Sequence, residues 1–437
     1  MMPKRLFKRE VHGNEYRSHP ESSVRSVILR HGWGIIPVMV GLLLVGCDLE
    51  ITNPGPVADE FLDPPEAHPA LVVGMERALA GASNWFSWSG SAAALEIRSS
   101  GGTGVFGMSP QLRLGELSQM NTEWAMGHRA RQVAEDGIRR MREVLGEGGF
   151  ATSESGGKAL VYAGFANRML GENVCQAVID GGPAEDYRVH LERAESQFSE
   201  ALQILGQVGN NEFENAARAG RASVRAALGR WSEAVDDAQS VPRDFVFASE
   251  RSPETDETRN RFARGNENQP WRATTVWSTY FEDYYVETGD PRTPWGEDPD
   301  NPLGEQPIPW RFELKYGPGN FTAPIALVSG HEMQLIVAES LLRGGQWTDA
   351  MEIVNERRSD LGVPSWSPSS EEEAWTALKL ERFIELWLEA RALFDHRRYA
   401  EENTPGPLPS EWDMTGRDLC FPISEAERDT NPNIPQS

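Results

Sequence analysis

The sequence predicts a mostly α-helical fold, with a scaffold of about four helical hairpins of the tetratricopeptide type beside an irregular, loop-rich lobe. Three observations support this prediction. Apolar residues recur at helical spacing over much of the chain. One hairpin-like pattern occurs twice. Long stretches rich in Pro, Gly and aromatic residues separate the helical segments.

The chain begins with a predicted signal peptide at residues 1–46. An apolar run starts near Ile35 and ends in Leu-Val-Gly-Cys, with Cys47 last. Small side chains before a cysteine form a lipobox, where a peptidase cuts and the thiol takes a lipid that holds the protein on a membrane. The run is shorter than the roughly 20 residues of a membrane-spanning helix. We therefore expect Cys47 to be the lipidated first residue of one domain, residues 47–437.

Basic residues should precede the apolar run of a signal peptide. The polar segment at 12–21 is too long for that basic region. We therefore expect translation to begin near Val24, with Arg25 and Arg30 as the basic residues. The expected cleavage before Cys47 is the same in either case.

The charge of the chain excludes some classes of partner. The full sequence has a formal net charge of −24, and residues 1–46 contribute seven basic and three acidic side chains, so residues 47–437 carry −28. Such an acidic surface repels nucleic acid and anionic lipid headgroups. We expect a neutral or cationic ligand and no nucleic-acid partner.

Helical periodicity locates the elements along the chain. The predicted helices lie at 67–80, 123–145, 158–171, 190–206, 213–229, 231–240, 331–344, 347–361 and 373–398. Those within about 123–242 and 329–398 form the predicted scaffold. The Pro-, Gly- and Trp-rich stretches at about 81–122, 243–328 and 400–437 form the predicted irregular lobe.

A repeated pattern is the reason for predicting hairpins. Residues 222–234 carry Ala, Gly, Trp and Ala at positions that recur with the same spacing in residues 338–350. Small residues on one helix, Gly at the turn, and Trp and Ala on the next helix let two antiparallel helices approach closely. Segments 123–171 and 190–229 fit the same pattern, which gives about four hairpins in all.

Two further cysteines, Cys175 and Cys420, follow Cys47. An exported chain meets an oxidising compartment, so the two either form a disulfide or remain buried thiols. No Cys or Cys/His cluster has the spacing of a zinc site, and Leu335 stands where the H-E-x-x-H motif that begins at His331 needs a second His. The sequence also lacks a nucleotide-binding glycine motif, so we expect neither metal nor cofactor.

Several blocks occur in an order that is typical of one protein family. They are 329–339, a helix that ends in Ala-Glu; 355–358 followed by 361–364; 381–391 with Phe394, Asp395, Arg397 and Arg398; 421–433; and the shorter pieces 290–292 and 315–316. In these blocks the chain resembles the SusD/RagB family of outer-membrane nutrient-binding lipoproteins, whose most specific signature is E-R-x-x-E-L-x-x-E-G-x-R-x-F-D-x-x-R. Ala390 stands where this signature has Gly.

The resemblance implies a function and a location. It implies a non-catalytic protein that binds an oligosaccharide or a peptide and delivers it, as the lid subunit, to a SusC-like TonB-dependent outer-membrane transporter. It also implies that the lipid on Cys47 anchors the protein to the outer membrane, facing the cell surface. The sequence leaves open which ligand binds and which membrane face carries the protein.

The charged residues of the signature block predict a structural ion-pair network. Glu381, Glu385 and Glu389 have the spacing of one helix face, where like charges repel unless cations match them. The predicted members are Glu381, Arg382, Glu385, Glu389, Arg391 and Asp395. Two carboxylates one turn apart also fit a general acid and base. On a packed repeat helix, however, they face a neighbouring helix, so we expect no enzyme activity.

Aromatic residues outside the predicted hairpins are candidate ligand contacts. An exposed indole or phenol ring matches the apolar face of a sugar ring, and nearby polar side chains can bond its hydroxyls. The candidates are Trp85, Trp88, Arg98, Trp277, Tyr280 and Tyr284. The alternative for each ring is a place in the core.

Two other functions fit parts of the pattern. A tetratricopeptide-type scaffold lipoprotein of outer-membrane assembly shares the repeats and the anchor but shows no stabilisation by a nutrient ligand. A helical glycoside hydrolase needs two carboxylates in an open cleft and cleaves glycans.

Overall fold

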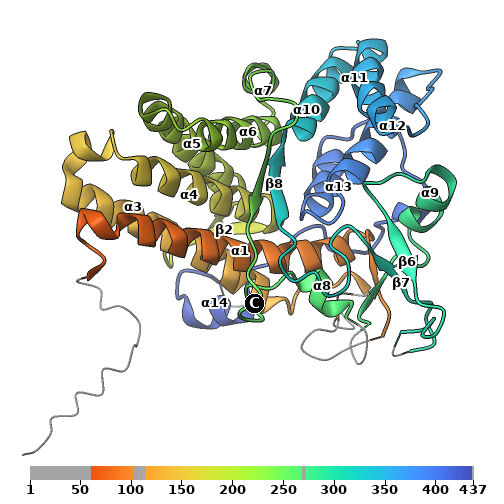
Figure 1. The fold of residues 1–437 in the computed structure, drawn as a ribbon, viewed down its shortest axis with the longest axis horizontal. Coiled ribbons are helices and arrows are strands. Elements are labelled where there is room, and N and C mark those ends of the chain that lie inside the picture. The colour runs from red at the N-terminus through yellow and green to blue at the C-terminus, as the bar shows by residue number, and fades with distance from the viewer. Residues whose placement is uncertain are drawn as a thin grey trace, which may run out of the picture. The chain divides into compact units, whose positions relative to one another are not determined.

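The computed structural model describes residues 61–101, 108, 112, 114–267, 272–304 and 306–435. The predicted signal peptide and Cys47 lie outside the described residues, so the lipid anchor stays a prediction. The described chain is mostly helical, as the sequence predicts (Figure 1). No helix in it is long and apolar enough to cross a membrane.

The scaffold is a series of helices that each pack on the next (Figure 1). From α3 to α7 every helix contacts its successor, and α10 then packs against both α6 and α7. The array therefore continues across the insertion at residues 239–329 and goes on through α11 and α12. The helices are α3 Asn121–Phe150, α4 Glu154–Asn173, α5 Arg188–Val208, α6 Asn211–Ala227, α7 Trp231–Ala238, α10 Gly330–Arg343, α11 Trp347–Asp360 and α12 Glu371–Glu385.

Small residues set the spacing of these helices. Phe198 on α5 lies between Gly164 on α4 and Gly220 on α6. A Cβ atom at Gly164 would lie 2.6 Å from the Phe198 ring, and one at Gly220 would lie 2.5 Å from it. The glycines therefore leave the volume that the buried ring of Phe198 fills.

Helix α1, His68–Ala93, is longer than the sequence predicts. The prediction ended this helix at residue 80 and assigned 81–93 to the irregular lobe, which is wrong. The Gly, Ser and Ala residues of 81–93 are weak or ordinary helix formers, but almost all of them are buried, and α1 packs against α3 and α4. A Cβ atom at Gly81 would lie 2.7 Å from Cε of Met126. Close packing of small residues thus outweighs their local propensity.

The irregular part contains short antiparallel strand pairs. Strands β4, Val246–Ser249, and β8, Ile325–Ser329, bring the two ends of the insertion together beside α6. The other pairs are β1 Arg98–Ser99 with β5 Thr274–Thr275, β2 Gln176–Val178 with β3 Ala184–Asp186, and β6 Trp295–Glu297 with β7 Arg311–Glu313. The remaining short helices outside the scaffold are η2 Pro65–Ala67, α8 Arg261–Gly265, α9 Tyr280–Thr288, η3 Ser410–Trp412 and α14 Glu425–Thr430.

The C-terminal segment returns to the end of α4. Cys175 and Cys420 form a disulfide across 245 positions of sequence, so of the two alternatives the structure has the bonded pair. The amide of Phe421 donates to the carbonyl of Asn173 at 2.8 Å, and the amide of Cys175 donates to the carbonyl of Phe421 at 2.9 Å. The disulfide and these two bonds fasten the C-terminal segment to the scaffold.

The signature block forms two helices. The prediction of one helix over 373–398 is wrong, because α12 ends at Glu385 and α13, Ala392–Glu401, begins after a turn. Leu388 and Ala390 have φ angles of 63° and 62°, in the left-handed region that favours glycine. Gly, which the signature has in place of Ala390, adopts this conformation without a Cβ clash. Glu389 consequently lies in the turn and shares no helix face with Glu385.

Candidate functional site

Two of the predicted ligand contacts lie in the core. Trp88 is 1% exposed, and its ring centroid lies 5.4 Å from that of Phe262. Tyr284 is 5% exposed, and its hydroxyl donates to Asp290 at 2.6 Å and accepts from Nη1 of Arg358 at 3.0 Å. Burial comes first among the causes that raise the pKa of Tyr284. The structure corrects both assignments, because neither ring offers a face to a ligand.

Two further predicted rings are covered on one side. Trp85 is half-buried on α1, and the guanidinium carbon of Arg261 lies 3.6 Å from its ring centroid. Tyr280, at the start of α9, stacks on Tyr284 with centroids 5.5 Å apart and lies 6.0 Å from the Trp412 ring. Both rings are chiefly packing residues whose outer edges reach the surface.

The remaining two candidates lie near each other beside the β1–β5 pair. Trp277 is 39% exposed, and Nε of Arg98 donates at 2.9 Å to the carbonyl of Ser278, the next residue. Pairing of Arg98 with Thr275 sets this proximity. An exposed indole beside a guanidinium is a surface on which a sugar ring or an acidic group can bind. We call it the Trp277 surface.

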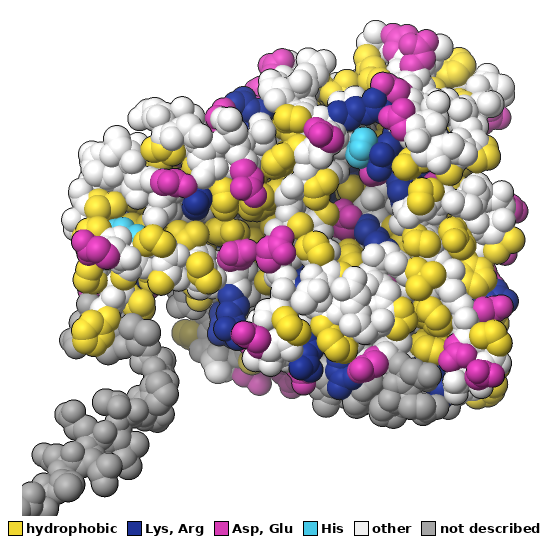
Figure 2. Space-filling view, viewed as in Figure 1, with side chains coloured by type: hydrophobic (Ala, Val, Ile, Leu, Met, Phe, Trp, Pro, Cys, Tyr) yellow, Lys and Arg dark blue, Asp and Glu magenta, His cyan; other side chains and the backbone are white. Residues whose placement is uncertain are grey.

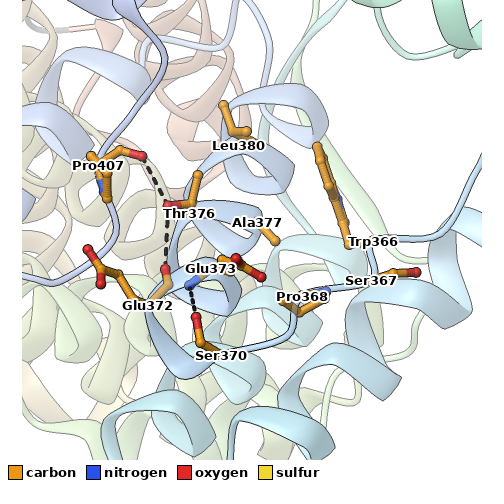
Figure 3. Close-up of a pocket in the computed structure, with 10 residues that line it drawn as sticks. All are labelled: Trp366, Ser367, Pro368, Ser370, Glu372, Glu373, Thr376, Ala377, Leu380 and Pro407. Atoms are coloured by element: carbon orange, nitrogen blue, oxygen red, sulfur yellow. Dashed lines mark hydrogen bonds between the residues drawn. The ribbon is translucent and has the colours of Figure 1, made fainter.

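A separate pocket, which the sequence did not reveal, opens at the end of the scaffold (Figure 3). Its volume is about 510 Å³, within the range of roughly 300–1,000 Å³ that is usual for small-molecule sites. The segment before α12, the first three turns of α12 and Pro407 form its walls. The lining residues are Trp366, Ser367, Pro368, Ser370, Glu372, Glu373, Thr376, Ala377, Leu380 and Pro407. We call it the Trp366 pocket.

The Trp366 side chain is held in place from several directions. Asn355 bonds both its backbone groups, accepting from the amide at 2.8 Å and donating to the carbonyl at 2.9 Å. Nε1 of Trp366 donates to Oε2 of Glu381 at 2.8 Å, and the guanidinium of Arg358 lies 4.6 Å from the ring centroid. Figure 3 shows Trp366 on the opposite side of the pocket from Pro407, with α12 between them. The indole is therefore fixed before any ligand arrives.

The wall formed by α12 is polar at its rim and apolar at its base. Ser370 caps the helix, accepting from the amide of Glu373 at 3.2 Å. The carboxylate of Glu373 accepts from the amide and hydroxyl of Ser369, and these bonds lower the pKa of Glu373. Glu372 is exposed, and its carboxylate has no partner among the described residues. Buried Leu380 belongs to the base.

The predicted ion-pair network lies behind the Trp366 pocket. Glu381 accepts from Nη1 of Arg292 and from Nη1 of Arg358, each at 2.6 Å. Glu385 accepts from Arg292 at 2.7 Å and from Arg357 at 3.3 Å. Burial acts to raise the pKa of Glu385, but the two arginines hold it below its usual value.

The other predicted members form further ion pairs. These are Arg382 with Asp395 at 2.7 Å, Arg391 with Glu332 at 2.8 Å, and Glu389 with Lys315 at 2.6 Å. Every carboxylate of the predicted network thus has a cationic partner, as in a structural network. The described residues contain no group of three or more side chains that could hold a metal ion. Acidic and basic side chains are also interspersed on the face in Figure 2.

The sequence did not predict the residues of the Trp366 pocket, because they follow no periodic pattern. Trp366 stands in the stretch Ser-Trp-Ser-Pro-Ser-Ser between α11 and α12. One signal was present: a Trp in a polar linker, just before a capping Ser370 and a Glu at the third helical position, predicts an aromatic ring beside a helix start. That signal does not say whether the ring faces a pocket.

These elements define the SusD-like fold: a helical-hairpin scaffold with a long insertion that carries irregular structure. Similar solved structures include a SusD superfamily protein from Bacteroides vulgatus, with TM-score 0.64, 15% identity, and 85% of this chain and 98% of that chain covered. A SusD-like carbohydrate binding protein from the same species has TM-score 0.57, 14% identity and coverage of 83% and 97%. Surface glycan-binding protein A from Bacteroides uniformis has TM-score 0.59, 14% identity and coverage of 83% and 98%.

The resemblance stated from the sequence is thus confirmed at the level of the fold. No protein-family model matches the sequence, and no curated protein matches it. At these identities the structural likeness shows the fold alone, so the ligand has to be argued from the residues of this chain.

Proposed function

We propose that this protein is a non-catalytic outer-membrane lipoprotein that binds an oligosaccharide and delivers it, as the lid subunit, to a TonB-dependent transporter. The observation that carries the proposal is the SusD-like fold over 83–85% of the chain, shared with proteins described as carbohydrate-binding and glycan-binding. The paired state of the network carboxylates is consistent with binding without catalysis.

In this proposal the parts of the chain have separate tasks. The lipid on Cys47 holds the protein at the membrane. The hairpin scaffold keeps the binding surfaces rigid, since a preformed surface loses less entropy when a ligand binds. Exposed indole rings supply apolar area for sugar rings. The transporter supplies the energy for uptake, so this chain needs no nucleotide.

The binding step is tested with the purified protein, residues 48–437, and a panel of oligosaccharides and peptides. Thermal shift identifies ligands, and isothermal titration measures affinity. We expect an oligosaccharide to raise the melting temperature and to be recovered uncleaved. Stabilisation by peptides alone would replace the oligosaccharide with a peptide nutrient. Cleavage of a glycan would contradict the non-catalytic role, and absence of any ligand would favour the assembly-scaffold alternative.

The anchor and the partner are tested in cells. Cys47→Ser should release the protein from the membrane fraction, because one residue carries the predicted lipid. Wild-type protein solubilised from membranes should co-purify with a TonB-dependent transporter. Co-purification with outer-membrane assembly factors instead would contradict the lid role.

A further inference from the structure

The Trp366 pocket has the physical features of a carbohydrate site. Its indole is held by Glu381 and Arg358 and its backbone by Asn355, so its orientation does not depend on a ligand. A fixed aromatic ring binds the C–H face of a sugar with little loss of side-chain entropy. Buried Ala377 and Leu380 add apolar surface beside it. The pocket therefore combines a stacking ring with an apolar base.

The polar groups around the rim fit hydroxyl groups. The lining includes the hydroxyls of Ser367, Ser370 and Thr376. Thr376 donates its hydroxyl proton to the carbonyl of Pro407 at 3.0 Å, which leaves the oxygen free to accept. The carboxylate of Glu372, without a partner among the described residues, also accepts only. Sugar hydroxyls, which both donate and accept, match this set.

The charge of the lining restricts the class of sugar. Glu372 and Glu373 both line the pocket, and no Lys, Arg or His is among its described lining residues. An anionic glycan that bears carboxylate or sulfate groups would meet two like charges, and like charges brought together oppose binding. An uncharged sugar meets acceptors for its hydroxyls.

We propose that the Trp366 pocket is a binding site for uncharged sugar rings, separate from the Trp277 surface, and that it discriminates against acidic glycans. This assignment rests on the proposed function, because it supplies the class of ligand that the protein captures. The occupant is a neutral oligosaccharide whose ring stacks on Trp366 and whose hydroxyls bond Glu372 and the rim hydroxyls.

The test compares two tryptophans in similar surroundings. Trp231 is half-buried like Trp366 and has the guanidinium of Arg343 at 4.2 Å from its ring centroid, as Trp366 has Arg358. Trp231 does not line the pocket. Neutral oligosaccharides are titrated into wild-type protein, Trp366→Ala and Trp231→Ala. We expect Trp366→Ala to weaken binding at least about tenfold, as loss of a central aromatic contact does, and Trp231→Ala to bind as wild type.

A second variant guards against misfolding. Trp366→Ala removes the donor to Glu381, so its melting curve is recorded first. Trp366→Phe also lacks this donor, but it fills more of the site than Ala and keeps a smaller aromatic face. Its melting curve is recorded in the same way, and it should bind several-fold more weakly than wild type. For charge selection, Glu372→Lys changes an exposed side chain. It should strengthen binding of an oligosaccharide that contains uronic acid relative to a neutral one of the same length.

The outcomes separate this inference from the proposed function. If neutral oligosaccharides bind wild type and both Trp366 variants equally, the pocket assignment is overturned while glycan binding stands. If no oligosaccharide binds wild type, both fail. If a lysine-containing peptide binds in a Trp366-dependent manner and neutral sugars do not, the sugar assignment is overturned. Equal affinity of wild type for acidic and neutral oligosaccharides overturns the charge selection.

Discussion

Arg358 on α11 and Glu381 on α12 form a buried ion pair, with Nη1 and Oε2 2.6 Å apart. The same carboxylate oxygen accepts from Nε1 of Trp366 at 2.8 Å. The wall of the Trp366 pocket is therefore bonded to the buried ion-pair network of the scaffold. The carboxylate of Glu381 therefore both stabilises the last hairpin and holds the Trp366 ring in place.

Removal of the Glu381 charge should destabilise the fold. In Glu381→Gln, the buried guanidiniums of Arg292 and Arg358 lose a charged partner. Breaking a buried pair by removing one partner costs about 3–5 kcal/mol. Asp290 and Glu385 remain beside Arg292 and reduce the effect. We therefore expect a loss of about 3 kcal/mol in the free energy of unfolding, measured by urea denaturation.

The matched control for this change is Glu371→Gln. Glu371 lies in the first turn of the same helix and is exposed. Surface substitutions of this kind change stability by within about 0.5 kcal/mol. Equal losses for the two variants would show that burial of the ion pair does not matter.

Loss of the disulfide should also lower stability. The bond between Cys175 and Cys420 closes a loop of 245 positions, which restricts the unfolded chain. Replacing both cysteines by Ala should cost about 2–5 kcal/mol, measured by urea denaturation without reductant. Reductant should lower the stability of wild type and leave the double variant unchanged. A wild-type protein whose denatured, unreduced form exposes two thiols would refute the pairing.

The surroundings of Gly164 and Gly206 predict opposite effects of an added methyl group. Gly164→Ala places a methyl group against the Phe198 ring, where the Cβ would lie 2.6 Å away. Overpacking of this kind costs about 1–3 kcal/mol. Gly206→Ala, on an exposed helical position with Glu214 at 3.9 Å as its nearest contact, should instead stabilise, by about 0.4–1 kcal/mol. Thermal unfolding of both variants checks the signs, and stabilisation by Gly164→Ala would contradict this packing.

A buried carboxyl predicts one component of the pH dependence. Burial raises the pKa of Glu313 from 4.5 to about 7, against bonds from the backbone of Tyr316 and the charge of Lys315, which lower it. Between these two values the folded protein keeps a proton that the unfolded chain releases. The stability due to this group is therefore complete below about pH 4.5 and is lost as the pH rises to about 7.

Glu313→Gln isolates this component. The amide cannot titrate, and its oxygen still accepts from the amide of Tyr316, as the carboxylate does at 2.8 Å. From pH 5 to pH 8 the wild type should lose about 1–3 kcal/mol of unfolding free energy relative to the variant. Other groups, including the half-buried His128 with its pKa lowered to about 4, titrate alike in both proteins and cancel in the difference. Parallel pH profiles would contradict the raised pKa of Glu313.

Much of the scaffold followed from the sequence because its pattern is local. Helical periodicity placed α3 to α7 and α10 to α11 within a few residues of their bounds. The signature residues predicted members of an ion-pair network, whereas the structure shows who pairs with whom, including Arg382 with Asp395 and the partner Arg292 for Glu381. The turn at Leu388 could not be predicted, because Leu388 and Ala390 are not residue types that indicate a left-handed backbone conformation.

The binding surfaces could not be predicted from the sequence in the same way. Trp88 and Trp277 are both tryptophans in stretches that the sequence marks as irregular, yet one is 1% exposed and the other 39%. Their exposure depends on which distant elements pack over them. Phe262 covers Trp88 from a position 174 residues away in sequence. No property of the neighbouring residues distinguishes the two.

By itself the sequence determined the helical class, the repeat that stacks the hairpins, the acidic charge and six members of the ion-pair network. Only the tertiary structure decided how far α1 extends, where the signature block turns, which aromatic rings stay open and that Trp366 stands over a pocket. The physical reason is the distance along the sequence over which each interaction acts. Periodicity and capping act within a few turns of the chain, whereas burial of a ring and the shape of a pocket depend on contacts between segments that are far apart in sequence.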